Sequence, residues 1–254
     1  MPLFRLSERV EFPPAWLARS DGLLCIGGDL EPQRLVLAYK NGIFPWFSSN
    51  EPILWWSPDP RLVVFPPDIR VSRSLKKKIK KHPFDIRVNT AFEQVIVACA
   101  QPRQSKDEGT WLIDGMIEAY ITLHEMGYAH SVEAWCGNQL AGGLYGVSIG
   151  KAFFGESMFS RMPDASKIAL VSLARYLRRL DFDLIDCQVT TDHLLSMGAV
   201  EVPRDHFLDI LNRSVNAAVS PDTWTRGKIL DPDDSSGSEI KTAIKESDNE
   251  ISLL

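Results

Sequence analysis

The sequence predicts an α+β fold, in which a small N-terminal α/β domain precedes a larger domain built on a mixed sheet. The first observation is the length of 254 residues, which exceeds the usual single-domain size and carries 44% hydrophobic residues. The second is a series of strand-like runs between residues 130 and 158, and the third is an amphipathic helical pattern directly after them. We therefore expect domains at residues 1–62 and 63–230, followed by a tail at residues 231–254.

The N-terminal part begins with a short apolar run, residues 23–26, that ends at Gly27 and Gly28. A helix is expected next, because Asp29 can cap it, Pro32 suits its first turn and Gly42 suits its end. Residues 44–66 are dense in Trp, Phe and Pro, so we predict an irregular segment anchored by its aromatic side chains.

From residue 84 the pattern becomes regular. It predicts helices near 90–99 and 112–126, and then three strands at His130–Cys136, Leu140–Val147 and Lys151–Met158. A helix begins at Asp164 or Ser166, followed by a strand at Asp183–Val189 and helices at Thr191–Met197 and Arg204–Val215. This order is that of an acyl-CoA N-acetyltransferase (GNAT-like) domain, whose mixed sheet splays to admit an acyl donor. By itself the order only nominates acyl transfer.

Composition excludes several classes of protein. No apolar run approaches the roughly 20 residues that a membrane span needs, and the N-terminus lacks the apolar core of a signal peptide, so we expect a cytoplasmic protein. The four cysteines form no CxxC pair and the five histidines form no HExxH motif. We expect neither a disulfide framework nor a metal site, and a monomer is the simplest assumption.

The net charge of −5 resides entirely in the tail, which carries seven acidic and two basic residues. Residues 1–230 are formally neutral, which leaves room for a local basic patch and hence for a nucleic-acid partner. The tail is too polar to offset its ordering entropy, and we predict that it is disordered.

Six blocks resemble the bacterial leucyl/phenylalanyl-tRNA–protein transferases. They are Gly22-Leu23-Leu24 leading to Gly27-Gly28-Asp29-Leu30, Gly42-Ile43-Phe44-Pro45-Trp46-Phe47, Trp55-Trp56-Ser57-Pro58-Asp59-Pro60-Arg61, Gly109-Thr110-Trp111-Leu112, Gly155-Glu156-Ser157-Met158-Phe159-Ser160-Arg161 and Leu184-Ile185-Asp186-Cys187-Gln188. Six blocks in one order are far more specific than any single motif, and the match runs from about residue 10 to residue 225.

The resemblance implies the acetyltransferase-like domain, no metal and no bound cofactor. It implies transfer of Leu or Phe, and less well Met, from leucyl-tRNA or phenylalanyl-tRNA to proteins that begin with Arg or Lys. Such proteins then become substrates of N-end rule degradation. Because aminoacyl-tRNA is already an activated ester, the acceptor amine attacks it without ATP.

Asp186, Gln188 and Glu156 are the candidate catalytic residues. Asp186 and Gln188 lie two positions apart near a strand end, so both side chains are expected on one face with Cys187 on the other. We predict that Gln188 orients the attacking amine and that Asp186 draws off its proton, directly or through Gln188. Glu156 would hold the amine or the basic side chain of the acceptor's first residue, or orient the α-amino group of the donor amino acid. The competing interpretation is that Asp186 and Gln188 only cap a nearby loop.

Selectivity for Leu and Phe requires a deep apolar pocket. Leu144, Phe153, Leu173 and Ile185 match pocket positions of the family, and each lies on an element expected around the cleft. Ordinary core is the competing interpretation for each of them, because a pocket wall and a core use the same residue types.

Two features are candidates for tRNA binding. The densest basic run supplies Arg73, Lys76, Lys77, Lys80 and Lys81 on a helix capped by Ser72 or Ser74, with Leu75 and Ile79 inward. Trp46 and Trp111 lie beside glycine-containing turns and could stack on the unpaired bases of a CCA end. A solvated lysine-rich face and core tryptophans are the alternatives.

Two other functions stay open at this point. An acyl-CoA N-acetyltransferase would need a pyrophosphate-binding turn after the meander, and residues 160–165 do not provide one. A noncatalytic tRNA-binding module would need only the basic helix and the aromatic residues.

Overall fold

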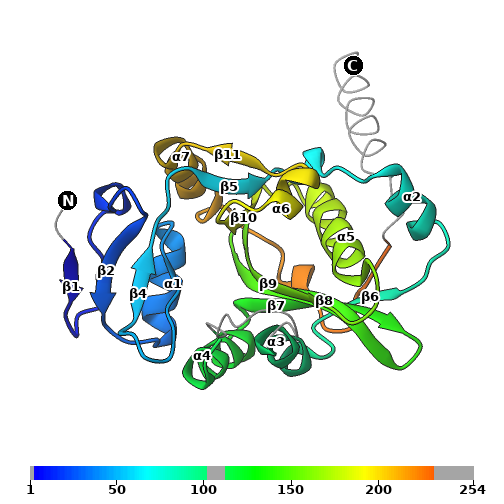
Figure 1. The fold of residues 1–254 in the computed structure, drawn as a ribbon, viewed down its shortest axis with the longest axis horizontal. Helices are drawn as coiled ribbons and strands as arrows, with labels where there is room; N and C mark the ends of the chain where they lie inside the picture. The colour runs from blue at the N-terminus through cyan, green and yellow to red at the C-terminus, as the bar shows by residue number, and fades with distance from the viewer. Residues whose placement is uncertain (1–2, 102–111, 232–254) are drawn as a thin grey trace, which may run out of the picture.

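A computed structural model of the chain describes residues 3–101 and 112–231 (Figure 1). The prediction of a disordered tail and the candidate Trp111 lie outside the described residues. Two β-sheets lie side by side, the smaller formed by the N-terminal segment and the larger by the rest of the described chain. The described residues contain no helix that is long and apolar enough to cross a membrane.

The small sheet has the strand order β1-β2-β4-β3. Its strands are β1 (Phe4–Leu6), β2 (Leu23–Gly27), β3 (Phe44–Pro45) and β4 (Leu54–Trp56), with the 3-10 turn η1 (Ala15–Leu17) between β1 and β2. The predicted helix is present as α1 (Pro32–Lys40), with Pro32 in its first turn. The expectation of an irregular segment at 44–66 is wrong, because β3, β4 and β5 (Arg61–Val64) lie there. Strands of two to four residues between prolines are too short to show an alternating pattern.

The large sheet has the order β11-β5-β10-β9-β8-β7-β6-β12. Its further strands are β6 (Asp85–Val88), β7 (Ala129–Cys136), β8 (Gln139–Ile149), β9 (Ala152–Ser160), β10 (Leu184–Gln188), β11 (Val200–Val202) and β12 (Ile229–Leu230). Strands β7, β8 and β9 form the predicted antiparallel meander, whereas β10 runs parallel to β9. The predicted α+β class with a mixed sheet in the larger part of the chain is therefore confirmed.

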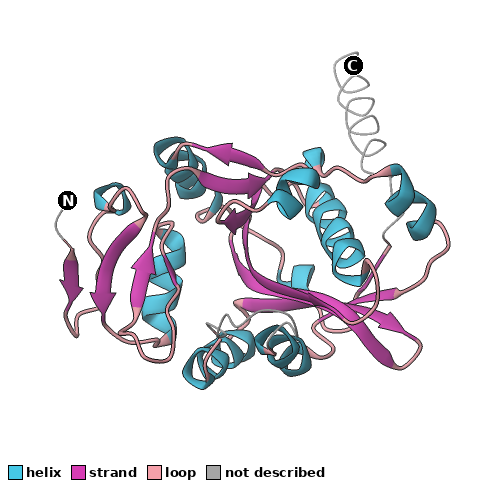
Figure 2. Ribbon diagram, in the orientation of Figure 1, coloured by secondary structure: helices cyan, strands magenta, loops and turns pink. Residues whose placement is uncertain are grey.

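Helices cover both faces of this sheet (Figure 2). Helices α3 (Phe92–Ala100) and α4 (Asp114–Glu125) pack on one face, and α5 (Ala165–Arg179) packs on the other. Alternation along the strands supplies both cores, since Leu144 and Phe153 join the α5 side while Tyr145 and Phe154 join the α3 and α4 side.

The remaining described elements lie around the sheet. They are η2 (Pro66–Asp68), α2 (Arg73–Ile79), α6 (Asp192–Ser196), α7 (Arg204–Ser214) and η3 (Pro221–Trp224). The predicted helices at 191–197 and 204–215 correspond to α6 and α7. Strand β5 spans the expected boundary at residue 62 and pairs with β10 and β11 inside the large sheet. The division at residue 62 stays a prediction, and a boundary just before β5 would keep that strand whole.

The sheet opens between β9 and β10. Their parallel pairing covers only three residue pairs and ends at Asp186 and Phe154, after which β9 continues along β8 alone. On the opposite side, Gly146 lies at a register shift in β8, and a Cβ there would approach the Phe154 carbonyl oxygen to 2.1 Å. Glycine is thus required where the strands crowd together, and the separation of β9 from β10 makes room for a site.

Candidate active site

A cavity of about 340 Å³ opens where β9 and β10 separate, and we name it the β9–β10 cavity. Its apolar walls include all four predicted pocket residues, Leu144, Phe153, Leu173 and Ile185. Met158 and Leu170 extend these walls. The same cavity is also lined by Glu156 and Gln188, so the structure brings an apolar pocket and two of the three predicted catalytic residues together.

Glu156 lies on β9 and is held by two donors. The Tyr120 hydroxyl donates to Oε2 at 2.7 Å, and Gln188 Nε2 donates to Oε1 at 2.7 Å. The Tyr120 hydroxyl also shares a short hydrogen bond with the hydroxyl of Tyr39 from α1. Burial, with a smaller effect from the neighbouring Asp186 charge, raises the pKa of Glu156 to about 7 against the opposing effect of its hydrogen bonds. This carboxyl group therefore titrates near neutral pH.

Gln188 ends β10 in an unusual backbone conformation. Its φ is 65°, and the pairing of β10 with β5 shifts register between Asp186 and Gln188. A residue other than glycine in the left-handed region carries strain, and here it turns the side chain toward Glu156. Because Nε2 donates to Glu156, the other atom of the side-chain amide, Gln188 Oε1, is the hydrogen-bond acceptor at the cavity.

Asp186 lies outside the cavity lining. It is fully buried and accepts hydrogen bonds from Arg61 Nε at 2.8 Å and Arg61 Nη2 at 2.7 Å. Its Oδ1 also accepts the backbone N–H of Gln188 at 2.9 Å. The expectation that Asp186 and Gln188 share one face, with Cys187 on the other, is wrong. Cys187 and Gln188 both line the cavity, because the register shift interrupts the alternation of β10.

Neither Cys187 nor Ser160 shows the features of an activated nucleophile. Burial raises the pKa of the Cys187 thiol well above its usual range, which keeps it in the unreactive thiol form. Ser160 is held by the Ser166 hydroxyl and backbone N–H. Both observations agree with direct attack by an external amine.

Sequence reasoning missed Arg61, Tyr120 and Tyr39. A signal for Arg61 was present, because it opens an apolar strand where an arginine requires a buried acid as partner, and Asp186 is the acid in another apolar strand. Nothing in the local sequence distinguishes Tyr120 and Tyr39 from core tyrosines, since they meet Glu156 only through the packing of α1 and α4.

The basic helix is present as α2, but it ends at Ile79, so Lys80 and Lys81 follow it instead of lying on it. Ser72 accepts the Leu75 backbone N–H at 3.2 Å, and Leu75 and Ile79 are buried. The five basic candidates for tRNA binding are all exposed, namely Arg73, Lys76, Lys77, Lys80 and Lys81. Lys78 differs, because it is half-buried and donates to Asp164 at 2.7 Å.

The tryptophans of the N-terminal segment divide by burial. Trp46 is 43% exposed and is therefore available to a partner, whereas Trp55 is fully buried and donates through Nε1 to the Gly27 carbonyl at 2.9 Å. No group of three or more His, Cys, Asp or Glu residues within 3–101 and 112–231 could hold a metal ion.

Comparisons with known proteins match almost the whole described chain. The family model described as leucyl/phenylalanyl-tRNA protein transferase matches residues 63–212, and the model of the N-terminal domain of these transferases matches residues 28–59. Leucyl/phenylalanyl-tRNA–protein transferase from Desulforapulum autotrophicum is 60% identical over 88% of this chain and 98% of the relative.

Two further relatives carry the same name. The protein from Syntrophobacter fumaroxidans is 53% identical over 88% of this chain and 96% of its own length. The protein from Nitrosomonas eutropha is 56% identical over 84% of this chain and 92% of its own length. A solved ribosomal-protein alpha-N-acetyltransferase in complex with coenzyme A is 23% identical, covering 44% of this chain and 68% of that chain at a TM-score of 0.25.

Proposed function

The chain belongs to the leucyl/phenylalanyl-tRNA–protein transferase family, and on that basis we propose that it transfers leucine or phenylalanine from aminoacyl-tRNA to the N-terminal amino group of a protein. The observation that carries the proposal is the β9–β10 cavity. Its apolar walls suit a branched or aromatic donor side chain, and Glu156 and Gln188 are placed to meet the polar groups of the same amino acid. Methionine is the weaker donor, because its flexible, unbranched side chain fits an apolar pocket in several conformations.

The chemistry requires little beyond orientation. The acceptor nitrogen bonds to the ester carbonyl carbon while the bond from that carbon to the ribose oxygen breaks. The proton that the amine loses ends on the released ribose hydroxyl. Because the ester is already activated, neither ATP nor a covalent enzyme intermediate is part of this reaction, and positioning of the two reactants supplies much of the rate.

Gln188 and Glu156 have separate roles in the proposal. The side-chain oxygen of Gln188, Oε1, accepts a hydrogen bond from the attacking amine. This hydrogen bond aligns the lone pair of the amine with the ester carbon. Glu156, ionised above about pH 7, holds the α-amino group of the donor amino acid at the polar end of the cavity. Tyr120 fixes the carboxylate in position.

Asp186 is a positioning residue in this proposal. Both of its oxygens are engaged by Arg61, and it contacts Gln188 through the backbone N–H, so it sets the strained turn that presents the Gln188 side chain. An Asp186→Ala protein that remains folded, with a lowered kcat and a retained KM for leucyl-tRNA, supports the positioning role. Turnover close to that of the wild type removes Asp186 from the mechanism.

The partners follow from the family resemblance and from the exposed basic residues. We propose leucyl-tRNA and phenylalanyl-tRNA as donors, with the exposed face of α2 and Trp46 contacting the RNA. Acceptors are proteins that begin with Arg or Lys, and the added Leu or Phe marks them for N-end rule degradation. A monomer in the cytoplasm, where charged tRNA is available, completes the proposal.

The test uses purified full-length protein, radiolabelled leucyl-tRNA and a peptide that begins with Arg, without ATP or coenzyme A. The same peptide with an acetylated N-terminus is the control. Label on the free peptide alone supports the donor, the acceptor and the independence from cofactors. Absence of label, with salt-sensitive tRNA binding retained, favours a noncatalytic RNA-binding module instead.

A further inference from the structure

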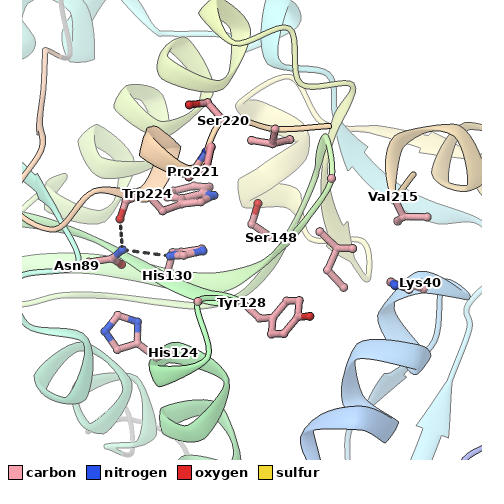
Figure 3. A pocket seen from close by; sticks show the side chains of 14 residues that line it. Lys40, Asn89, His124, Tyr128, His130, Ser148, Val215, Ser220, Pro221 and Trp224 are labelled. Carbon is pink, nitrogen blue, oxygen red and sulfur yellow. Dashed lines mark hydrogen bonds between the residues drawn. The ribbon is translucent and has the colours of Figure 1, made fainter. Parts of the chain in front are cut away.

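A second cavity, of about 460 Å³, opens beside the ends of β7 and β8 (Figure 3). We name it the Trp224 cavity, because Trp224 of η3 forms one wall together with His130, Ser148 and Tyr128. None of its described lining residues lines the β9–β10 cavity. The two cavities are separated by the Phe153 and Trp224 rings, whose centroids are 5.5 Å apart.

The hydrogen bonds of Asn89 determine which nitrogen of His130 carries the proton. The Ser131 backbone N–H donates to Asn89 Oδ1 at 3.0 Å, so Nδ2 is the donor end of this amide. Nδ2 donates to the Trp224 carbonyl at 2.8 Å and faces His130 Nδ1 at 3.1 Å. Nδ1 must therefore be the acceptor, and neutral His130 carries its proton on Nε2.

Two N–H donors at this cavity are buried without an acceptor among the described residues. They are His130 Nε2 and Trp224 Nε1. The His130 side chain is 4% exposed, and its ring stacks on Trp224 with the centroids 4.3 Å apart and the planes at 7°. A buried donor without a partner is unfavourable, so a pair of them on stacked rings at one cavity indicates a ligand that offers acceptor oxygens.

Charge narrows the choice of ligand. The described residues lining the cavity include no Asp or Glu, and Lys40 at the end of α1 is their one lysine or arginine. Burial, with a smaller effect from His124, lowers the pKa of His130 to about 3, so the ring stays neutral at physiological pH. The Gly127 carbonyl opposes this shift, yet it does not meet hydrogen-bond geometry with Nε2. One cation and neutral donors match a monoanion better than a phosphate dianion.

We propose that the Trp224 cavity binds a small organic carboxylate. Its oxygens accept the N–H groups of His130 and Trp224 and the Ser148 hydroxyl, and Lys40 balances its charge from the open side. The volume accommodates a molecule of about the size of an aromatic acid. This site is separate from the aminoacyl cavity and does not depend on the transfer reaction.

The test is a titration of ¹⁵N-labelled full-length protein with benzoate, followed through the indole N–H resonances. Benzyl alcohol is the uncharged probe with a ring of the same size. Trp224→Phe identifies the Trp224 resonance by its absence. We expect benzoate to move that resonance saturably, and benzyl alcohol to bind at least tenfold more weakly, because hydrogen bonds to a charged acceptor are among the stronger ones.

Variants make the proposal falsifiable. Trp224→Phe keeps a ring but removes the donor, so ligand-observed NMR should show a loss of benzoate affinity of about tenfold or more. Trp135→Phe is the matched control, since Trp135 Nε1 is also buried without a described partner but does not line the cavity. Lys40 is exposed, so Lys40→Met should weaken binding and change the stability of the fold little.

Three outcomes would overturn the proposal. One is equal binding of benzoate by Trp224→Phe and Trp135→Phe, which places the ligand elsewhere. Another is equal affinity for benzyl alcohol and benzoate, which shows an apolar pocket only. The last is a water cross-peak at the Trp224 indole proton that persists at saturating benzoate, because a bridging water then satisfies the two donors.

Discussion

Arg61 and Asp186 form a bidentate, buried ion pair, with side chains 1% and 0% exposed. The Arg61 guanidinium also donates to the Gly42 carbonyl at 3.3 Å and lies 4.8 Å from the ring centroids of Phe44 and Phe207. One side chain thus joins the small sheet, α7 and the turn that carries Gln188. The ion pair does not line the β9–β10 cavity, and it acts on the site through the hydrogen bond from the Gln188 backbone N–H to Asp186.

Breaking this pair should be far more damaging than removing it. Asp186→Asn leaves the Arg61 charge buried and unpaired, and we expect a loss of about 3–5 kcal/mol in the free energy of unfolding. The double variant Arg61→Met with Asp186→Asn should lose less than the sum of the single losses. Urea unfolding measures each free energy, and strictly additive losses would contradict the expected coupling.

A partly exposed ion pair provides the control for that experiment. Lys78 and Asp164 are also joined at 2.7 Å, but their side chains are 37% and 33% exposed. Asp164→Asn should therefore change the free energy of unfolding by less than about 1 kcal/mol.

The transfer rate should depend on the ionisation of Glu156. With a pKa of about 7, the carboxyl group is half ionised at neutral pH, and kcat/KM should rise as the pH passes through that value. Gln188→Glu places a second carboxyl group at the position that now donates to Glu156, so it should move the rising limb to higher pH. The acceptor amine, with a pKa of about 8, is the same in both assays and cannot produce a difference. Superimposable profiles for the two proteins would exclude Glu156 as the titrating group.

Glu156 should also make stability depend on pH. Its pKa is raised from an ordinary 4.5 to about 7 on folding, mainly by burial. An acid of this kind contributes stability that is fully present below pH 4.5 and is lost as the pH rises through 7. Glu156→Gln cannot ionise, so its stability relative to the wild type should increase from pH 5 to pH 8 by up to about 3 kcal/mol. Parallel curves of unfolding free energy against pH would show that the carboxyl group is ordinary.

The walls of the β9–β10 cavity should set donor preference. Leu173 and Leu177 are successive inward positions of α5 and both are fully buried, but only Leu173 lines the cavity. Substitution of either by alanine should cost about 2–5 kcal/mol of stability. Only Leu173→Ala should change the ratio of phenylalanine to leucine transfer, toward the larger donor, and competition assays with both charged tRNAs measure that ratio. A shift of the same size in Leu177→Ala would mean that general loosening is responsible.

The exposed face of α2 should contribute to tRNA affinity through phosphate contacts. Replacing Lys77, Lys80 and Lys81 by Gln should weaken binding and reduce the slope of log K against log salt, by up to about 0.9 for each phosphate that these lysines neutralise. Lys78→Gln, in the same helix but already paired with Asp164, is the matched control and should leave that slope nearly unchanged. Equal slopes for the triple variant and the wild type would show that these lysines face solvent and do not contact tRNA phosphates.

Most of the fold could be predicted from local patterns in the sequence. The 3.6-residue period of α5, the capping serine of α2 and the strand-like runs of β7 to β9 with their intervening turns are properties of neighbouring residues, so sequence reasoning located them within a few positions. The short strands β3 to β5 were not predicted, because their extended conformation depends on pairing with other strands and not on their own few residues.

The site divides in the same way. The sequence and its family resemblance selected Glu156 and Gln188 within the blocks, and Leu144, Phe153, Leu173 and Ile185 as matches to pocket positions of the family. Only the tertiary structure decided that Asp186 faces Arg61 and that Cys187 enters the cavity in its place. Cys187 shares the cavity face with Ile185, a one-residue register shift in β10 adds Gln188 to that face, and Asp186 on the other face pairs with an arginine 125 positions away. Burial and long-range pairing set the direction of a side chain and the pKa of a carboxyl group, and neither is a property of the neighbouring residues in the chain.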